Sequence, residues 1–94
     1  MTVQVRSVLY IARILSGRKI SVDVPEQSDL HGLLRELTVL YGQEFYDAVC
    51  DEDGYSDRKA SVLVNGRNAA AIGGVGIKLK DGDDVLIMPV ISGG

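Results

Sequence analysis

The sequence of 94 residues contains a single cysteine, a single histidine and no tryptophan. One cysteine excludes an internal disulfide, and it excludes an iron–sulfur cluster held by this chain alone, which needs about four thiolates. Cys50 ends an apolar-rich segment, so we expect a small buried residue and not a reactive thiol. His31 has no second histidine or cysteine at ligand spacing, so we predict no metal site and a solvated side chain in a first helical turn.

Excess positive charge and long hydrophobic runs are also lacking. Ten basic residues against thirteen acidic ones give a net charge of −3, which provides no basic footprint for nucleic acid and favours a basic protein surface as partner. No apolar run approaches the ~20 residues of a membrane span, and the opening Met1–Arg6 does not resemble a signal peptide. We therefore expect one cytoplasmic domain over residues 1–94 that binds no membrane and no nucleic acid.

The first quarter of the chain is typical of two strands. Val3 and Val5 alternate with polar residues, and the apolar run 8–11 predicts that this first strand continues to Ile11, buried on both faces. Residues 14–18 form a turn. Residues 20–24 then alternate again, and Pro25 ends this second strand, so the two are expected to pair as a hairpin.

One amphipathic helix follows. Ser28 is suited to cap its N-terminus and Gly42 to end it, with apolar residues at helical spacing between them: Leu30, Leu33, Leu34, Leu37, Leu40 and Tyr41. Such a stripe can bind a partner, but beside several strands it favours covering a sheet. Residues 43–57 predict a short helix followed by an acidic loop. The sequence departs from the calcium-binding pattern at Tyr55, so we expect a solvated loop and not a calcium site.

The last third of the chain predicts further strands at 60–64 and 84–91, the latter almost wholly apolar, with a turn at Asn65-Gly66. The glycine-rich segment 73–76 lacks the Gly-Lys-Ser/Thr ending of a phosphate loop and precedes an extended segment, so a nucleotide must be bound by a partner. The two most apolar strands, the first and the last, should lie side by side, in parallel, in the middle of the sheet. The predicted class is α+β, a β-grasp (ubiquitin-like) mixed sheet of four to five strands with one main helix across one face.

The C-terminal segment carries the strongest functional signal. Ser92, Gly93 and Gly94 directly follow the last strand, and Pro89 lacks an N–H and so limits sheet pairing there. Two residues without a Cβ can enter a narrow enzyme cleft that a side chain would obstruct. We therefore predict a flexible, functional tail over residues 92–94, the alternative being a terminus that only frays.

These features together resemble the MoaD/ThiS family of ubiquitin-like sulfur carriers, and most of all the small subunit of molybdopterin synthase, MoaD. The resemblance covers nearly the whole chain, and two of its blocks are specific, 79–85 (LKDGDDV) and 88–94 (MPVISGG). Further landmarks are 8–13 (VLYIAR) and 64–67 (VNGR). Val90 departs from the pattern, because the molybdopterin branch often has a second proline there.

The resemblance implies that this chain is not an enzyme and binds no cofactor of its own. An E1-like activating enzyme similar to MoaB, MoeB or ThiF uses ATP to adenylate the carboxylate of Gly94, and a sulfur donor then converts it to a thiocarboxylate. The acceptor is a MoaE-like large subunit of molybdopterin synthase or another sulfur-acceptor enzyme. Partner contacts fall by resemblance on Ile11, Met88, Pro89 and Ser92, with the region 68–69 less certainly aligned; Ile11 and Met88 are equally compatible with core positions.

Other functions remain open at this point. The chain can be a ubiquitin-like modifier joined to lysines through Gly94, a sulfur carrier for cysteine or thiamine biosynthesis, or a β-grasp binding module without tail chemistry. The first two share the adenylate step with the leading hypothesis.

Overall fold

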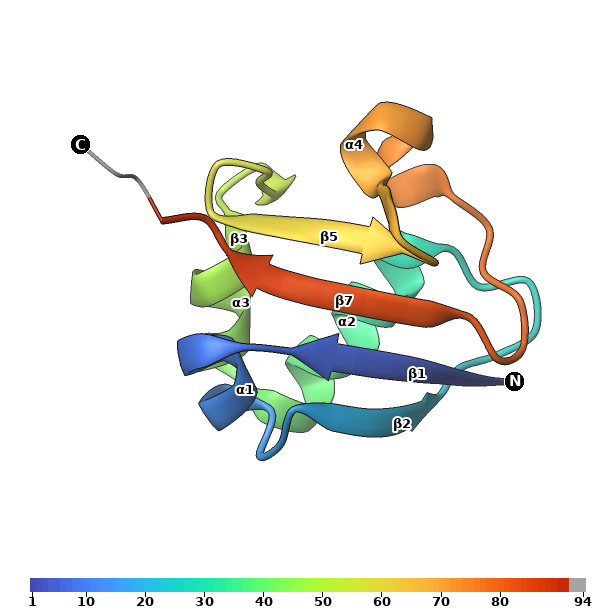
Figure 1. The fold of residues 1–94 in the computed structure, drawn as a ribbon, viewed down its shortest axis with the longest axis horizontal. Coiled ribbons are helices and arrows are strands. Elements are labelled where there is room, and N and C mark those ends of the chain that lie inside the picture. The colour runs from blue at the N-terminus through green and yellow to red at the C-terminus, as the bar shows by residue number, and fades with distance from the viewer. Residues whose placement is uncertain (92–94) are drawn as a thin grey trace.

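A five-stranded mixed sheet lies at the centre of this computed structural model, which describes residues 1–91 (Figure 1). Its spatial order is β2-β1-β7-β5-β6. The strands are β1 (Thr2–Ser7), β2 (Lys19–Asp23), β5 (Ala60–Val64), β6 (Arg67–Asn68) and β7 (Asp84–Pro89). The predicted β-grasp class is confirmed.

The first and last strands form the middle of the sheet, as predicted. β1 and β7 run parallel, with Gln4 opposite Asp84 and Ser7 opposite Ile87, and each has an antiparallel neighbour on its other side. Alternate residues of these strands face the core: Val3, Val5, Val62, Val85 and Ile87 are all fully buried. A parallel central pair requires a long crossover, and α2 with the elements after it provides one.

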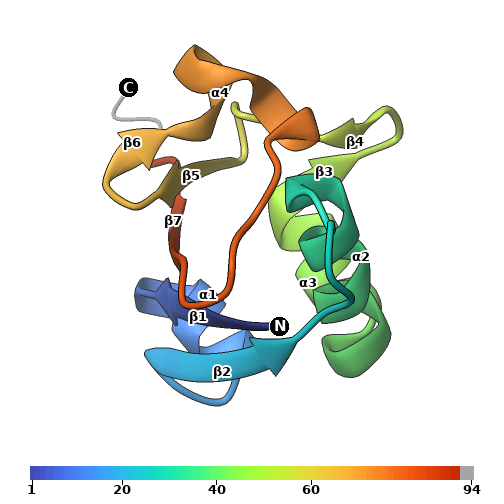
Figure 2. The ribbon, with the colours of Figure 1, turned by 90° about the vertical axis from the view of Figure 1, so that its right-hand side faces the viewer.

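Helices α2 (Leu30–Tyr41) and α3 (Gln43–Val49) cover one face of the sheet, so the molecule has two layers (Figure 2). Leu30, Leu33, Leu34 and Leu37 of α2 are buried against the sheet, at the spacing that predicted the helix. The N-cap is Asp29 and not Ser28, because the Asp29 carboxylate accepts from Gly32 N at 2.8 Å, while the Ser28 hydroxyl donates to Pro25 O.

The prediction that the first strand extends to Ile11 is wrong. The chain leaves the sheet after Ser7 and forms α1 (Leu9–Ile14), a helix of under two turns that packs against β7 and α3. Ile11 and Leu15, four residues apart, are both fully buried, so the run 8–15 follows the period of a helix. An apolar run this short does not distinguish strand from helix.

The remaining elements are small. The predicted acidic loop contains a hairpin of β3 (Cys50–Asp51) and β4 (Gly54–Tyr55), and Asn65-Gly66 turns β5 into β6 with positive φ at both residues, as a tight hairpin requires. α4 (Ala69–Ile72) and the 3₁₀ turn Gly74–Gly76 connect β6 to an extended segment before β7. None of the helices in residues 1–91 has the length and apolarity to cross a bilayer.

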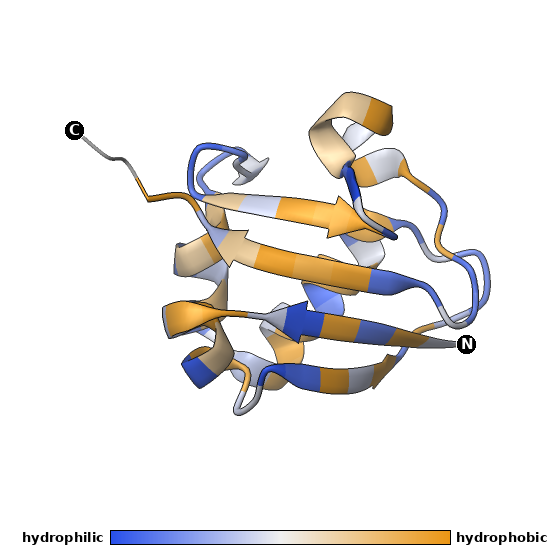
Figure 3. Cartoon of the chain, in the orientation of Figure 1, coloured by the Kyte–Doolittle hydropathy of each residue, from blue (hydrophilic) through white to orange (hydrophobic). Residues whose placement is uncertain are grey.

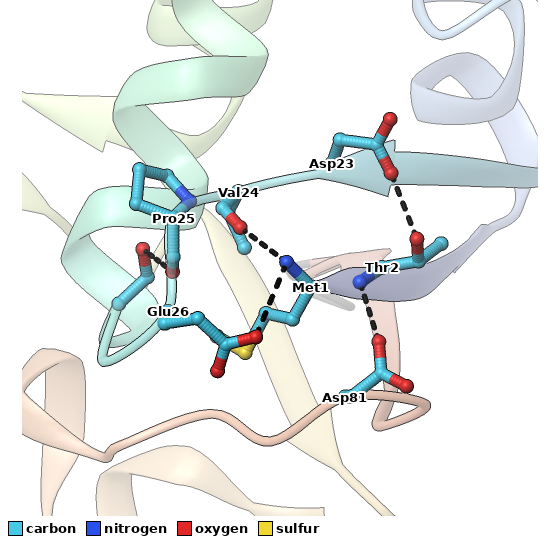
Figure 4. A network of polar contacts seen from close by, with 8 residues as sticks. Met1, Thr2, Asp23, Val24, Pro25, Glu26 and Asp81 are labelled. Atoms are coloured by element: carbon cyan, nitrogen blue, oxygen red, sulfur yellow. Dashed lines mark hydrogen bonds and ion pairs between the residues drawn. The ribbon is translucent and has the colours of Figure 1, made fainter.

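A polar network holds the starting end of β1 (Figure 4). The amino group of Met1 donates to Val24 O at 2.9 Å, and the Thr2 hydroxyl donates to Asp23 at 2.8 Å. The Thr2 N–H donates to Asp81 at 2.7 Å, in the turn that precedes β7. These bonds fix β1 against β2 and β7 at the end of the sheet opposite to the end of β7.

Candidate functional site

The end of β7 delivers the C-terminal segment to the surface. Val90 N donates to Lys59 O, next to β5, at 3.0 Å. Backbone N–H groups of successive strand residues point to opposite sides, so the nitrogen of the buried Pro89 faces the side of β1. β1 has already ended at this level, at Ser7. This explains a proline in a central strand, since no pairing bond is lost. Val90 and Ile91 are then 40% and 73% exposed. The predicted Ser92, Gly93 and Gly94 lie outside the described residues.

The outer face of the sheet carries an apolar cluster beside this end. No helix of the described chain crosses that face (Figure 1), and hydrophobic residues continue along both β5 and β7 (Figure 3). Leu86 pairs with Leu63, and Met88 with Ser61, all on the outward-facing side of their strands and only partly buried. We call Leu63, Leu86 and Met88 the sheet patch.

A second group of exposed apolar side chains surrounds the same end. Val8, Leu9 and Tyr10 are 36%, 59% and 42% exposed. Because β1 and β7 are parallel and Ser7 lies opposite Ile87, residues 8–10 leave the sheet beside the last residues of β7 and the segment 90–91 that follows it. Sequence reasoning missed residues 8–10 because it assigned them to a buried strand.

Of the two apolar positions expected on a docking surface, Ile11 and Met88, the structure places one in the core and one at the surface. Ile11 is fully buried inside α1, so it is a core residue and its expected place on a docking surface is wrong. Met88 is partly exposed and belongs to the sheet patch. In the less certainly aligned region, Asn68 caps α4 by accepting from Ala70 N, and Ala69 is buried, which gives both residues structural roles.

One ion pair borders the sheet patch. Arg6, the parallel neighbour of Leu86, binds both carboxylate oxygens of Asp84, at 2.8 and 2.6 Å. This hydrogen bonding lowers the pKa of Asp84, and the same contact raises the pKa of Arg6. A bidentate pair of this kind fixes the direction of both side chains as well as adding attraction.

Cys50 and His31 lie in the helical layer and not on the outer face of the sheet. Both line a hollow of about 240 Å³ between α2, α3 and the β3–β4 hairpin, together with Tyr46 and Tyr55. Cys50 is 6% exposed, and burial raises the pKa of its thiol, which makes the thiolate scarce at neutral pH. No group of three metal-ligating side chains occurs within residues 1–91.

Comparison with known proteins agrees with this geometry. The model of the ThiS family matches residues 8–94. Small archaeal modifier protein SAMP1 from Haloferax volcanii superposes with a TM-score of 0.83 at 23% identity, covering 100% of both chains. A putative molybdopterin converting factor subunit 1 from Pyrococcus furiosus superposes with a TM-score of 0.76 at 23% identity, and the match covers 97% of this chain and 99% of the Pyrococcus chain.

Urm1 from Trypanosoma brucei gives a TM-score of 0.79 at 26% identity, over 99% of this chain and 95% of its own. Comparison with curated protein sequences found no match. The family model covers most of the chain, and the neighbours share its whole fold. The chain belongs to the ThiS family of ubiquitin-like sulfur carriers.

Proposed function

We propose that this protein is a sulfur carrier whose C-terminal Gly94 is converted to a thiocarboxylate, and that it donates this sulfur in molybdopterin biosynthesis. The observation that carries the proposal is the end of β7: a central strand finishes at Pro89, and Ile91 is 73% exposed beside two apolar surfaces. A terminal carboxylate placed three residues further on is within reach of any enzyme docked there.

Gly94 cannot accept sulfur directly, because a carboxylate is a poor electrophile. In the proposed first step a carboxylate oxygen bonds to the α-phosphorus of ATP and pyrophosphate leaves. A hydrosulfide equivalent then attacks the acyl carbon, AMP leaves, and the thiocarboxylate results. ATP and the catalytic groups belong to an E1-like partner similar to MoaB, MoeB or ThiF, so this chain acts as the substrate and not as the enzyme.

The sheet patch and the exposed residues around it support a carrier that binds two partner enzymes in turn. Leu63, Leu86 and Met88 form an uncovered apolar surface next to the tail, which fits both the activating enzyme and a MoaE-like sulfur acceptor. Gly93 and Gly94 let the tail pass through a narrow channel, and recognition there rests on backbone contacts. Each ordered tail residue costs about 1 to 2 kcal/mol of backbone entropy, which docking of the apolar surface has to offset.

A second candidate function is protein modification. The similar structures include SAMP1, which is named a small archaeal modifier protein. A modifier would use the same adenylate with a lysine amine as the nucleophile. The Pyrococcus neighbour, named a putative molybdopterin converting factor subunit, favours the carrier at the same sequence identity of 23%. The two functions differ in what becomes of Gly94.

The decisive experiment alters the chain end alone. Deleting Gly94, or adding one residue after it, should abolish ATP–pyrophosphate exchange by the activating enzyme of the same genome, while the melting temperature stays unchanged because the buried core ends before residue 90. Exchange by the extended chain at the parental rate would show that the terminal carboxylate is not the reactive group.

A further inference from the structure

Leu9 has a conformation and an exposure that the fold does not require. Its φ is +58°, in the left-handed region, and its side chain is 59% exposed. For a leucine this backbone is disfavoured, because the Cβ crowds the following carbonyl oxygen; glycine and asparagine adopt it readily. Leucine here neither fills the core nor suits the local backbone, and strain of this kind is concentrated at functional sites.

Three basic residues lie on the elements that meet where β1 ends, two residues before Leu9, and none of them forms an ion pair within residues 1–91. Arg13 is on α1. Arg18 directly precedes β2 and accepts from Ser7 N through its carbonyl oxygen, and Lys19 is the first residue of β2. All three are exposed, and none has a carboxylate within 4 Å among residues 1–91, where the ion pairs are Met1 with Glu26 and Arg6 with Asp84.

Two carboxylates lie in the vicinity of these cations. Glu44 lines a shallow hollow of about 360 Å³ with Tyr10, Arg13 and Ile14, and Asp84 is near enough to Lys19 for that charge to help lower its pKa. Asp84 is already held by Arg6. Arg13, Arg18 and Lys19 therefore form a group of exposed basic residues, and the neighbouring carboxylates Glu44 and Asp84 form no ion pair with them.

We propose that Leu9, Tyr10, Arg13, Arg18 and Lys19 form a docking surface, the α1 ridge, for the activating enzyme. The matching enzyme surface is an apolar hollow for Leu9, bordered by carboxylates. This inference rests on the proposed function, because an enzyme that takes the chain end has to approach the adjacent α1 ridge. Burial of Leu9 stabilises the complex, while the cations accelerate association and lose their effect as salt screens them.

The experiment uses two pairs of matched variants of the full chain. Leu9→Asn is compared with Leu40→Asn, since Leu40 is 55% exposed on α2 in the helical layer. The double variant Arg13→Glu/Arg18→Glu is compared with Arg67→Glu/Lys80→Glu, which changes net charge equally elsewhere on the surface. The readouts are melting temperature and kcat/KM for pyrophosphate exchange, at low salt and at about 0.5 M salt, where screening is nearly complete.

Leu9→Asn should melt at the parental temperature or higher, because asparagine tolerates positive φ, yet lose at least about tenfold in kcat/KM. Leu40→Asn should retain parental activity. Arg13→Glu/Arg18→Glu should fall at least about tenfold below its charge-matched control at low salt, with the gap closing at high salt.

Parental activity of Leu9→Asn, or equal losses in the two charge-reversed proteins, would overturn the α1 ridge while leaving the proposed function in place. Failure of the parent protein to be adenylated would instead refute the proposed function, and the α1 ridge with it.

Discussion

At the scale of single residues, Ile11 and Met88 show how two similar apolar side chains take opposite roles. Both are large, apolar and near the end of a central strand, and the resemblance placed both on a partner surface. Ile11 is fully buried because the chain turns into α1 two residues before it. Met88 remains on the outer face because it alternates with buried Ile87 and Pro89 in β7.

Met88→Asp tests the sheet patch against a core control. We expect binding to each partner to weaken by more than ~2 kcal/mol, as for a central interface residue, with a small change in melting temperature. Ile11→Ala should instead destabilise the fold by roughly 2 to 5 kcal/mol and affect binding only through the unfolded fraction. Calorimetric titration and thermal melts measure the two effects; unchanged binding by Met88→Asp would remove the sheet patch from the docking surface.

Cys50 provides a test of the chemical route. A persulfide mechanism needs a thiol on the carrier, whereas a thiocarboxylate mechanism needs only Gly94. Because Cys50 is buried and its pKa is raised, we expect Cys50→Ser to keep full sulfur transfer per folded molecule. The buried hydroxyl should lower stability by about 1 to 3 kcal/mol, so Cys50→Ala serves as an apolar control. A loss of transfer shared by both variants at equal folded concentration would contradict the thiocarboxylate route.

At the scale of elements, β7 combines a structural and a functional pattern. Its nearly continuous apolar sequence is typical of a strand covered on both faces. Only one face is covered here, by α2 and α3, so Leu86 and Met88 remain on the open face. An apolar strand with one uncovered side is therefore itself a signal of a binding surface.

The ion pair between β1 and β7 predicts a pH dependence. The folded-state pKa of Asp84 lies below its ordinary value, so its contribution to stability is present above the unfolded pKa of about 3.9 and is lost as pH falls through the folded pKa. Asp84→Asn should be less stable than the parent at pH 7, with the difference shrinking below about pH 4. Urea midpoints between pH 7 and pH 2 measure this; a constant difference would mean that the ion pair is not its origin.

At the scale of the whole molecule, stability and function are assigned to different regions. The helices and the inward residues of the sheet form one hydrophobic core, and the polar network around Met1 and Thr2 holds the opposite end. The outward-facing residues of the sheet, and Val90 and Ile91 after β7, contribute little to that core. Variants there can lose partners without unfolding, which makes the proposed function separable from stability.

The covalent state of the whole protein in its native cells distinguishes a carrier from a modifier. A carrier returns as a free carboxylate after each transfer, while a modifier stays joined to its targets through an amide. Protein isolated from its native cells should therefore be mostly free, with the mass of the unmodified chain or of one oxygen replaced by sulfur at Gly94. Intact mass spectrometry checks this. A ladder of heavier species that resists denaturant and disappears on deletion of Gly94 would favour the modifier.

Local periodicity was sufficient for much of the fold. The leucine spacing of α2, the Asn65-Gly66 turn, the alternation in β1 and the apolar run of β7 are near-neighbour patterns, and they predicted the β-grasp sheet. The parallel central pair was also predicted correctly, although the apolar run 8–11 that was counted with the first strand belongs to α1. The diglycine end and its flanking blocks likewise identified the family from sequence, because a tail acts through its own residues.

Tertiary structure decided the burial of those apolar residues whose position the local pattern left open. A one-residue change of register reverses the face of every side chain in a strand, and a short run such as 8–15 fits either helix or strand until packing selects one. The assignment of Ile11 to the core, of Met88 to the surface and of Leu9 to a strained, exposed position therefore depended on contacts between segments as distant in sequence as β1 and β7. Those contacts arise only when the chain has folded.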